Sequence, residues 1–562
     1  MWTGPSKQDP DRSDAEHNGD PPRPEYEQQK EIEAPCREDA RSIPCLDGGI
    51  GTDDIHLLPV DTERPQLQLS KSNQLRHLAA IGQCEPSLVT WTSLLRSSYD
   101  FSLFSTLASL RINRVFLSPN PRNIEVFRAV ANHAELRHRI VEIIYDDARL
   151  LRSAEEAIHQ AHYDDHDDWN NDVDLEWFRL ARDENLRTLK ARRFMDADFP
   201  HHNAMAQEVA AEMPLGESWV YYQSLVREDD NVIATGADIE ALRYGPRRFP
   251  SLRMVTVTPA THGWLFSPLY KTPMIREFPY GFNYPIPRGW PTFGDADIPI
   301  EAKSWAIETE AVKWRGYRVV TRVLAEEREH HHVSELLIDS NQLYTGLNCH
   351  LFEQSCEEYT NLVSILQQPG FSHIHLSLLI RAQEGEDEDW SAFRSGLLRD
   401  SLAQAVDLKH ISLATNLNPD SDAVLDYGVE PPLLRTIFPI DHWPHLQHFG
   451  LWNFIMKQVD LLAFLSALPP TLRSLDLGFL TIMDGHHRRL LSEMRSTLGW
   501  RGRPMQPRVS IVTAVAPVLR VGRAIWLEEE VNDFLYRDGK NPFEWPGWRV
   551  QDGTILCLMV WE

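Results

Sequence analysis

The chain has 562 residues, of which 82 are acidic and 56 are Lys or Arg, so its formal net charge is −26. Nucleic acids and anionic membrane surfaces are both bound through clustered positive charge, so this composition argues against either as a partner. Hydrophobic residues make up 42% of the chain and include 17 Trp, which is enough apolar side chain for a large core.

Six cysteines are too few for a disulfide scaffold, and the sequence contains no C-x-x-C pair that would indicate a zinc site. No stretch reaches the ~18–20 apolar residues of a membrane span. The first 33 residues lack the apolar core of a secretory signal. We therefore expect reduced thiols and a protein of the cytoplasm, the nucleus or both.

Residues 1–55 are predicted to be a disordered tail, because seven prolines interrupt a charged sequence that has no helical or strand period. Further along, residues 114–117 are predicted as a short strand. Asn120 and Pro121 then suit the N-cap and the first position of a helix, since Asn accepts free amide hydrogens and Pro lacks one. A buried strand is predicted for the β-branched residues 139–145.

The most informative pattern is a repeat of apolar residues at relative positions 1, 4 and 6, as in the L-x-x-L-x-L strand of a leucine-rich repeat. Segments with this pattern begin at Ile140, Leu252, Val333, Phe371, Leu408, Leu446 and Leu472. The last five starts are separated by 38, 37, 38 and 26 residues, as expected if a full helix follows each strand. Asn341 and Asn416 occupy position 9, where Asn is expected to hydrogen-bond the turning backbone.

Apolar residues at helical spacing lie between these segments and predict helices at 351–366, 390–406, 459–468 and 489–498. Such alternation also fits a doubly wound sheet. That alternative is disfavoured, because no dinucleotide-binding or P-loop motif follows a strand and the strands lack long Val and Ile runs. We therefore predict an α/β fold: an irregular leucine-rich-repeat-like solenoid of strand–helix repeats.

The predicted solenoid region covers residues 119–515 and contains a helical insertion around 150–245. A packed aromatic and Pro-rich loop is expected at 278–299. Residues 516–562 are predicted to cap the array, with an amphipathic helix at 525–536 and a final strand at 554–561.

Several segments resemble a large group of fungal F-box proteins. They are Arg114-Val-Phe-Leu-Ser118, Asn120-Pro-Arg-Asn-Ile-Glu-Val-Phe127, Leu136-Arg-His-Arg-Ile-Val-Glu-Ile-Ile-Tyr-Asp-Asp147, Leu535-Tyr536 with Gly539, and Asn541-Pro-Phe543. In that family an N-terminal F-box precedes an irregular leucine-rich-repeat region. The resemblance covers most of the chain from Leu94 onward.

The resemblance implies a small, degenerate F-box-like helical unit at residues 56–118. Residues 94–104 are similar to the last helices of an F-box. The implied adaptor-binding residues are Leu94, Leu95, Phe101 and Phe104. The N-terminal half is degraded, because residues 60–65 replace the expected apolar helix and Pro65 would break it.

As the resemblance implies, the chain is expected to be a non-catalytic substrate-recognition subunit of a cullin-based, SCF-type ubiquitin ligase. It would bind a Skp1-like adaptor and hold an unknown target protein on the strand face. Its contribution would be proximity, which raises the effective concentration of a target lysine near the ubiquitin carrier. The alternative is a leucine-rich-repeat protein-interaction scaffold that has lost adaptor binding.

No catalytic constellation is present in the sequence, so we expect no enzymatic activity, cofactor or metal. His330, His331 and His332 are adjacent and point in different directions on a helix, which indicates a solvated helix end. His162 and His166 have a zinc-binding spacing, but their Asp-rich surroundings predict a charged loop.

Four tryptophans lie near predicted strand ends or loops: Trp290, Trp305, Trp443 and Trp452. Exposed Trp side chains often anchor a protein partner. Trp side chains also fill irregular cores, and we favour this second interpretation.

Overall fold

The computed structural model describes residues 112–152, 173–195, 201–292, 301–341, 343–380, 390–417, 430–514, 524–544, 548–551 and 554–557. All of them belong to the compact unit Gln66–Glu562. The predicted tail, the F-box-like unit as far as residue 111, and the segment that holds His162 and His166 lie outside the described residues.

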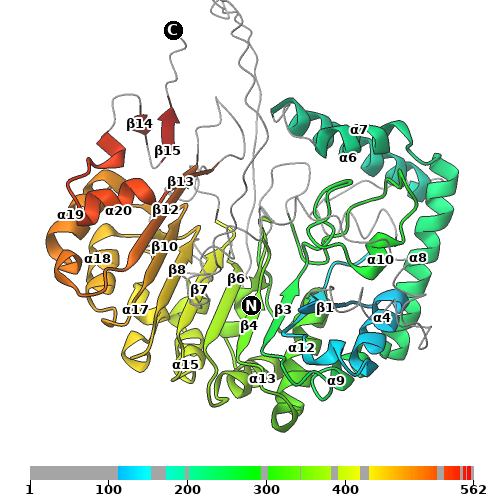
Figure 1. Ribbon diagram of the computed structural model, residues 1–562, viewed down its shortest axis with the longest axis horizontal. Helices are drawn as coiled ribbons and strands as arrows, with labels where there is room; N and C mark the ends of the chain where they lie inside the picture. The colour runs from blue at the N-terminus through cyan, green and yellow to red at the C-terminus, as the bar shows by residue number, and fades with distance from the viewer. Residues whose placement is uncertain are drawn as a thin grey trace, which may run out of the picture. The chain divides into compact units, whose positions relative to one another are not determined.

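The described chain is a mixed α/β fold with one large, mostly parallel sheet (Figure 1). Its strands, in spatial order, are β1 (Arg114–Leu117), β2 (Glu142–Asp146), β3 (Met254–Thr258), β4 (Glu335–Ile338), β6 (His373–Leu379), β7 (His410–Thr415), β8 (His448–Trp452), β10 (Ser474–Gly478), β12 (Arg508–Ala514) and β13 (Ala524–Leu527). Among the described strands of this sheet, β13 alone pairs antiparallel, and the short β5 (Leu347–Asn348) pairs with the end of β6. The described strands form no closed barrel, since β1 and β13 lie at opposite edges of the sheet.

Two small sheets accompany the large one. The strands β9 (Ile455–Met456) and β11 (Thr481–Ile482) pair parallel. The strands β14 (Trp548–Gln551) and β15 (Thr554–Cys557) pair antiparallel. The strand predicted at 554–561 is therefore present as β15, but it forms its ladder with β14 rather than with the large sheet.

The buried apolar side chains define the register of the large sheet. Residues at position 4 of the repeat are partners on successive strands: Ile143, Val255, Leu336, Ile374, Ile411, Phe449 and Leu475. Residues at position 6 pair in the same way: Tyr145, Val257, Ile338, Leu376, Leu413, Leu451 and Leu477. Every one of these side chains is at most 2% exposed. The predicted pairing of the seven segments, in chain order and in parallel, is confirmed.

A layer of helices covers the buried side of the sheet (Figure 1). These helices are α4 (Pro121–Asn132), α9 (Ala237–Tyr244), α12 (Arg315–Glu326), α13 (Glu357–Leu366), α15 (Leu397–Ala403), α17 (Leu434–Ile437), α18 (Gln458–Ser466), α19 (His487–Thr497) and α20 (Glu529–Tyr536). Each contacts the next in this order. Helices therefore follow the strands one by one, as the spacing of the repeat predicts.

Short helical segments complete the fold. They are α10 (Pro273–Arg276), α11 (Glu308–Ala311), α14 (Ser391–Arg394), and the 3-10 turns Leu136–His138, Val312–Trp314, Arg328–His330, Cys349–Phe352, Ile440–His442, Trp500–Gly502 and Pro542–Glu544. The helix predicted at 390–406 is divided into α14 and α15, because Gly396 adopts a left-handed φ of 85° between them. The prediction of an unbroken helix there was wrong.

The prediction of a helix at 525–536 was also wrong for the first part of this segment. Residues Ala524–Leu527 form β13, and only Glu529–Tyr536 is helical. Leu527 is buried beside Ile511 of β12, its partner in the antiparallel ladder. Pairing with the sheet therefore decided the conformation of this segment, rather than its helical spacing.

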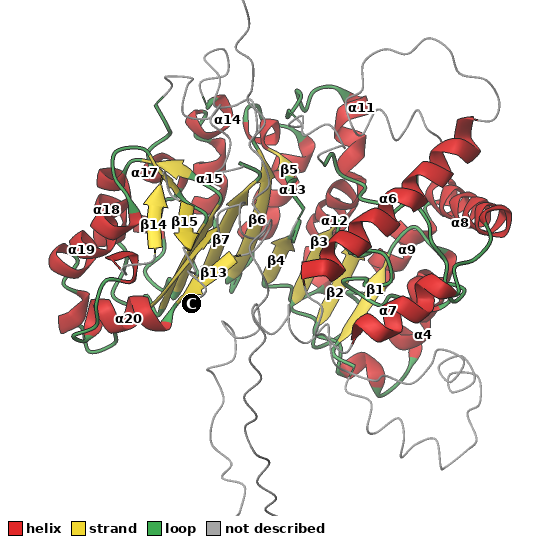
Figure 2. Ribbon diagram, turned by 90° about the horizontal axis from the view of Figure 1, so that it is seen from above, coloured by secondary structure: helices red, strands yellow, loops and turns green. Residues whose placement is uncertain are grey.

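The predicted helical insertion between β2 and β3 contains α6 (Val173–Met195), α7 (His201–Ala210) and α8 (Leu215–Thr235), followed by α9. Figure 2 shows these helices gathered at the β1–β3 end of the sheet. Helices α6 and α8 share a second apolar cluster with the loops after β2 and β3: Leu150, Phe178, Tyr222, Leu225, Phe282 and Tyr284. The aromatic loop predicted at 278–299 is thus packed against the protein up to residue 292, which is the last residue of the loop that the structure describes.

Polar side chains at the predicted caps make the expected contacts. The Asn120 side chain accepts hydrogen bonds from the amides of Arg122 and Asn123 at the start of α4. Asn416 Oδ1 accepts one from the amide of Ile380, which follows the neighbouring strand β6, at 2.8 Å. The prediction that these Asn side chains bond the turning backbone is confirmed for Asn416, whereas the Asn341 side chain donates to the Thr258 hydroxyl at 3.5 Å.

Leu475→Ala is expected to lower the free energy of unfolding by about 2–5 kcal/mol, because it leaves a cavity in a packed core. Hydrogen exchange should rise first around residues 446–500, since each strand–helix unit couples mainly to its neighbours. The matched control is Leu433→Ala, at a side chain that is 56% exposed. Unchanged exchange around residues 446–500 in Leu475→Ala would contradict this prediction.

Candidate functional site

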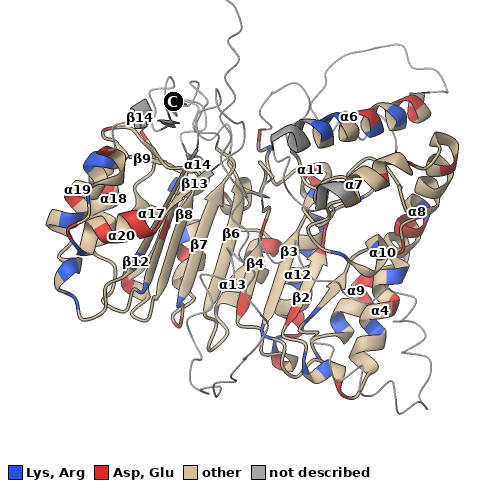
Figure 3. Ribbon diagram, turned by 45° about the horizontal axis from the view of Figure 1, so that its top comes forward, with Lys and Arg blue, Asp and Glu red and all other residues tan. Residues whose placement is uncertain are grey.

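The central strands of the sheet carry no formal charge. Strands β6, β7 and β8 contain no Lys, Arg, Asp or Glu, and Figure 3 shows them without the coloured charges that mark the helices. Each of these strands instead begins with a histidine: His373, His410 and His448. We call these three residues the histidine row.

The histidine row lies on the face of the sheet opposite the helix layer. Its members are direct partners in the parallel ladders, and the row continues on both sides along Glu335, His373, His410, His448, Ser474 and Arg508. All six side chains are half-buried, whereas the adjacent position-4 side chains are fully buried. The imidazole centroids of His373 and His410 are 5.3 Å apart, and those of His410 and His448 are 5.8 Å apart.

Polar contacts hold the two ends of the row. His373 Nδ1 lies 3.4 Å from the Glu335 carboxylate, and His448 Nδ1 lies 2.8 Å from Ser474 Oγ. His448 Nε2 is 3.9 Å from the Asp476 carboxylate. For the central His410, the described residues provide no hydrogen bond to the ring, so its two nitrogens are available to an external group.

The surroundings of the row keep the imidazoles of His410 and His448 uncharged near neutral pH. Burial, and then the neighbouring histidines, lower the pKa of His410 to about 4 and that of His448 to about 3. Burial also raises the pKa of Asp476 to about 7, with Glu528 adding to the rise and Arg508 opposing it. At neutral pH His410 and His448 therefore present imidazole groups that both donate and accept hydrogen bonds.

Stacked rings do not form a metal site. Zinc needs ligand atoms that converge on one point, and the planes of His410 and His448 are only 25° apart. Among the described residues, no three His, Cys, Asp or Glu side chains are grouped so that they could hold a metal ion.

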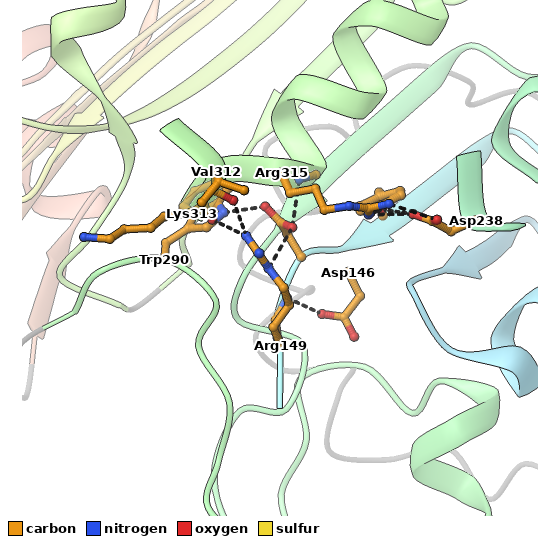
Figure 4. Close-up of polar contacts among 11 residues, drawn as sticks. Asp146, Arg149, Asp238, Trp290, Val312, Lys313 and Arg315 are labelled. Atoms are coloured by element: carbon orange, nitrogen blue, oxygen red, sulfur yellow. Dashed lines mark hydrogen bonds and ion pairs between the residues drawn. The ribbon is translucent and has the colours of Figure 1, made fainter. Parts of the chain in front are cut away.

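A second polar cluster lies at the carboxyl end of β2, and Figure 4 shows its contacts. Asp147 is buried and accepts hydrogen bonds from Trp290 Nε1 at 2.7 Å and from the amide of Gly316 at 2.8 Å. A Cβ atom added at Gly316 would lie 2.5 Å from Asp147 Cγ, so the close approach requires glycine. These bonds join β2 to the start of α12 and to the loop after β3.

The neighbouring ion pair fixes α9 against α12. Arg315 donates to both Asp238 carboxylate oxygens, at 2.7 and 3.0 Å, and the Tyr145 hydroxyl donates to Asp238 Oδ2 at 2.7 Å. Asp238 is fully buried and needs these donors to compensate for its lost hydration. Arg315 and Asp238 are therefore structural: their charges are paired with one another and hold the two helices together.

Asp146, in the same cluster, has a buried carboxylate oxygen, Oδ2, without a hydrogen-bond partner among the described residues. Its Oδ1 accepts a bond from the amide of Ala148 at 3.0 Å, while its Oδ2 lies 3.9 Å from His262 Nε2. His262 Nδ1 in turn is 2.8 Å from the Tyr284 hydroxyl. Burial raises the pKa of Asp146 to about 7 and lowers that of His262 to about 3.

Two hollows on the surface lie outside the histidine row and the Asp146–His262 pair. One of ≈ 300 Å³ is lined by Arg179, Arg182, Asp183, Glu212, Met213, Pro214 and Leu215, and one of ≈ 460 Å³ by Gly370, Asp407, Lys409 and His445. Neither is lined by the Asp146–His262 pair or by a member of the histidine row. The row is thus part of an open face rather than of either hollow.

The implied adaptor-binding residues Leu94, Leu95, Phe101 and Phe104 lie outside the described residues. The interpretation of Trp as core filling is confirmed for Trp290, Trp305 and Trp443, which are buried, whereas Trp452 is half-buried.

The predicted solvated helix end is correct for His330 and His332, which are exposed. It is wrong for His331, which is buried and lies with Nε2 2.9 Å from the carbonyl oxygen of Leu324. The chain turns out of the helix at this point, and that turn directs one of the three rings into the core.

A scan against protein-family models matches no family, and a search of curated proteins finds no matching relative. In the part of the chain that the structure describes, none of the helices combines the length and the apolar character needed to span a membrane.

Asp146→Asn is expected to make the protein more stable than wild type at about pH 8, with a smaller difference near pH 5. The reason is the raised folded-state pKa of about 7. The unfolded state ionises from about pH 4, so the stability that the bound proton provides is fully present below that pH and is lost as the pH rises through 7.

Thermal melts of both proteins at the two pH values measure this effect. The control is Asp538→Asn, at a side chain that is 94% exposed. An equal difference between wild type and Asp146→Asn at both pH values would show that Asp146 does not hold a proton in the folded state.

Proposed function

We propose that the chain is a non-catalytic recognition subunit that binds a target protein across the open face of its sheet. In this proposal the parallel strands and the helix layer form an irregular leucine-rich-repeat-like solenoid. The observation that carries it is the shared register, which leaves one face apolar and buried and the other lined by half-buried polar side chains. Such extended strand faces are the binding surfaces of repeat proteins.

We further propose that a Skp1-like adaptor binds the segment that contains Leu94, Leu95, Phe101 and Phe104, within a cullin-based ubiquitin ligase of the cytoplasm or nucleus. The support is the resemblance of the sequence to fungal F-box proteins. The subunit would then hold its target near the ubiquitin carrier and accelerate transfer by proximity alone.

A second candidate function is a protein-interaction scaffold that no longer binds the adaptor. Pro65 favours it, because a proline at this place would break the first helix of an F-box. The open sheet face serves both candidates, so adaptor binding is what separates them.

The Leu95→Asp, Phe101→Asp double variant is expected to lose adaptor binding, because each Asp would place an uncompensated charge in an apolar contact. The measurement is a pull-down of the full chain with purified Skp1-like adaptor. Leu433→Asp, Val459→Asp is the matched control, since both side chains are exposed on the helix layer, and circular dichroism verifies folding of all variants.

Loss of binding in the first double variant alone supports the ubiquitin-ligase role. Equal binding by wild type and both variants would remove Leu95 and Phe101 from the adaptor site. Absence of binding by the wild type would contradict the ligase role and favour the scaffold.

A further inference from the structure

The histidine row lies outside the buried apolar core. Burial of positions 4 and 6 defines the register, and the row occupies position 3, on the opposite face. Three consecutive strands nevertheless place the same side chain there. With parallel strands ~4.8 Å apart, the three imidazoles form a continuous strip across the middle of the sheet.

Charged or titratable groups surround this strip on the neighbouring elements. They are Arg253 before β3, Glu335 of β4, Asp339 after β4, His375 of β6, Lys409 before β7, Arg473 before β10, Asp476 of β10, Arg508 of β12 and Glu528 before α20. Several of them already pair with each other. Glu335 lies 3.4 Å from Arg253, and Arg508 pairs with Glu528.

Two cations beside the strip have no acidic partner among the described residues. Lys409 and Arg473 are exposed, directly precede β7 and β10, and contribute to the electrostatic environment of His410. Each would gain an ion pair if a carboxylate approached the row from solvent. Nearby cations also oppose protonation of His410, so an incoming negative charge would relieve an existing repulsion.

A carboxylate over the row would also change its protonation. An opposite charge within ~4–6 Å favours the charged form of a titratable group, so an anionic ligand would raise the pKa values of the imidazoles and recruit protons to them. Asp476, with its pKa of about 7, loses its negative charge over the same range as the pH falls. Both effects favour an anionic ligand more strongly at lower pH.

We propose that the histidine row, with Lys409 and Arg473, is the docking site for an Asp- and Glu-rich segment of the partner protein, and that docking is coupled to proton uptake. This inference rests on the proposed function, because it names the partner chemistry for the same sheet face. The net charge of −26 repels acidic peptides from the rest of the molecule, so the site would have to overcome that repulsion locally.

The test measures binding of a fluorescently labelled poly-glutamate peptide to the full chain by fluorescence anisotropy. Measurements at about pH 5.5 and about pH 7.5, at one ionic strength, keep the peptide largely ionised and hold screening constant. Wild type is expected to bind at least about tenfold more tightly at the lower pH, since each proton taken up contributes up to tenfold per pH unit. A poly-serine peptide should not bind.

The decisive variant is His373→Gln, His410→Gln, His448→Gln, which is expected to lose the part of the low-pH gain that comes from the imidazoles and to keep only the part that comes from Asp476. Its matched control carries the same change at three exposed histidines, His138, His332 and His442, and should behave as wild type. If the triple variant fails to fold, His410→Gln alone and Lys409→Ala, Arg473→Ala replace it, because His410 has no hydrogen bond to lose and the two cations are exposed. Each is expected to weaken binding at low pH.

Lack of peptide binding by wild type, binding independent of pH, or an unchanged pH dependence in the histidine variants would overturn the inference. Adaptor binding without peptide binding would overturn this inference alone. Peptide binding without adaptor binding would overturn the ubiquitin-ligase role and leave the acidic docking site as a property of the scaffold.

Discussion

Burial of two apolar side chains per strand against a single layer of helices is the constraint on which the rest of the structure depends. Positions 4 and 6 of seven segments meet in register across the sheet. A slip of one residue in any strand would turn these side chains toward the opposite face. The buried core therefore determines the register of the strands, and this register also determines which side chains lie next to one another on the open face.

The shared register brings side chains from separate strands together on the open face. Because positions 4 are aligned, positions 3 are aligned as well, and histidines from different repeats become neighbours. Gly450 contributes space on the same face, since a Cβ atom there would lie 2.5 Å from Ser412 Oγ and 3.3 Å from His448 Nε2. The open face can thus vary in sequence while the core remains constant, which suits the proposed binding of another protein across the strands.

The sequence predicted the strand register because its signal is periodic and local. The histidine row was missed although its signal was also present: aligning the segments that begin at Phe371, Leu408 and Leu446 places His373, His410 and His448 at the same position. The contact of Asp146 with His262 has no such signal, because the loop after β3 determines it. The strand β13 was mispredicted for a similar reason, since its ladder with β12 outweighs local helical spacing.

An NMR titration of the full chain, with histidine rings labelled at Cε1 and assigned by single His→Gln variants, tests the central claim most directly. If the core register packs the three imidazoles into one row, burial and mutual proximity should keep the pKa of His410 near 4 and that of His448 near 3. Values for both residues near the ordinary ~6.5 of an isolated histidine would contradict the account, because imidazoles in such a row cannot all ionise so easily.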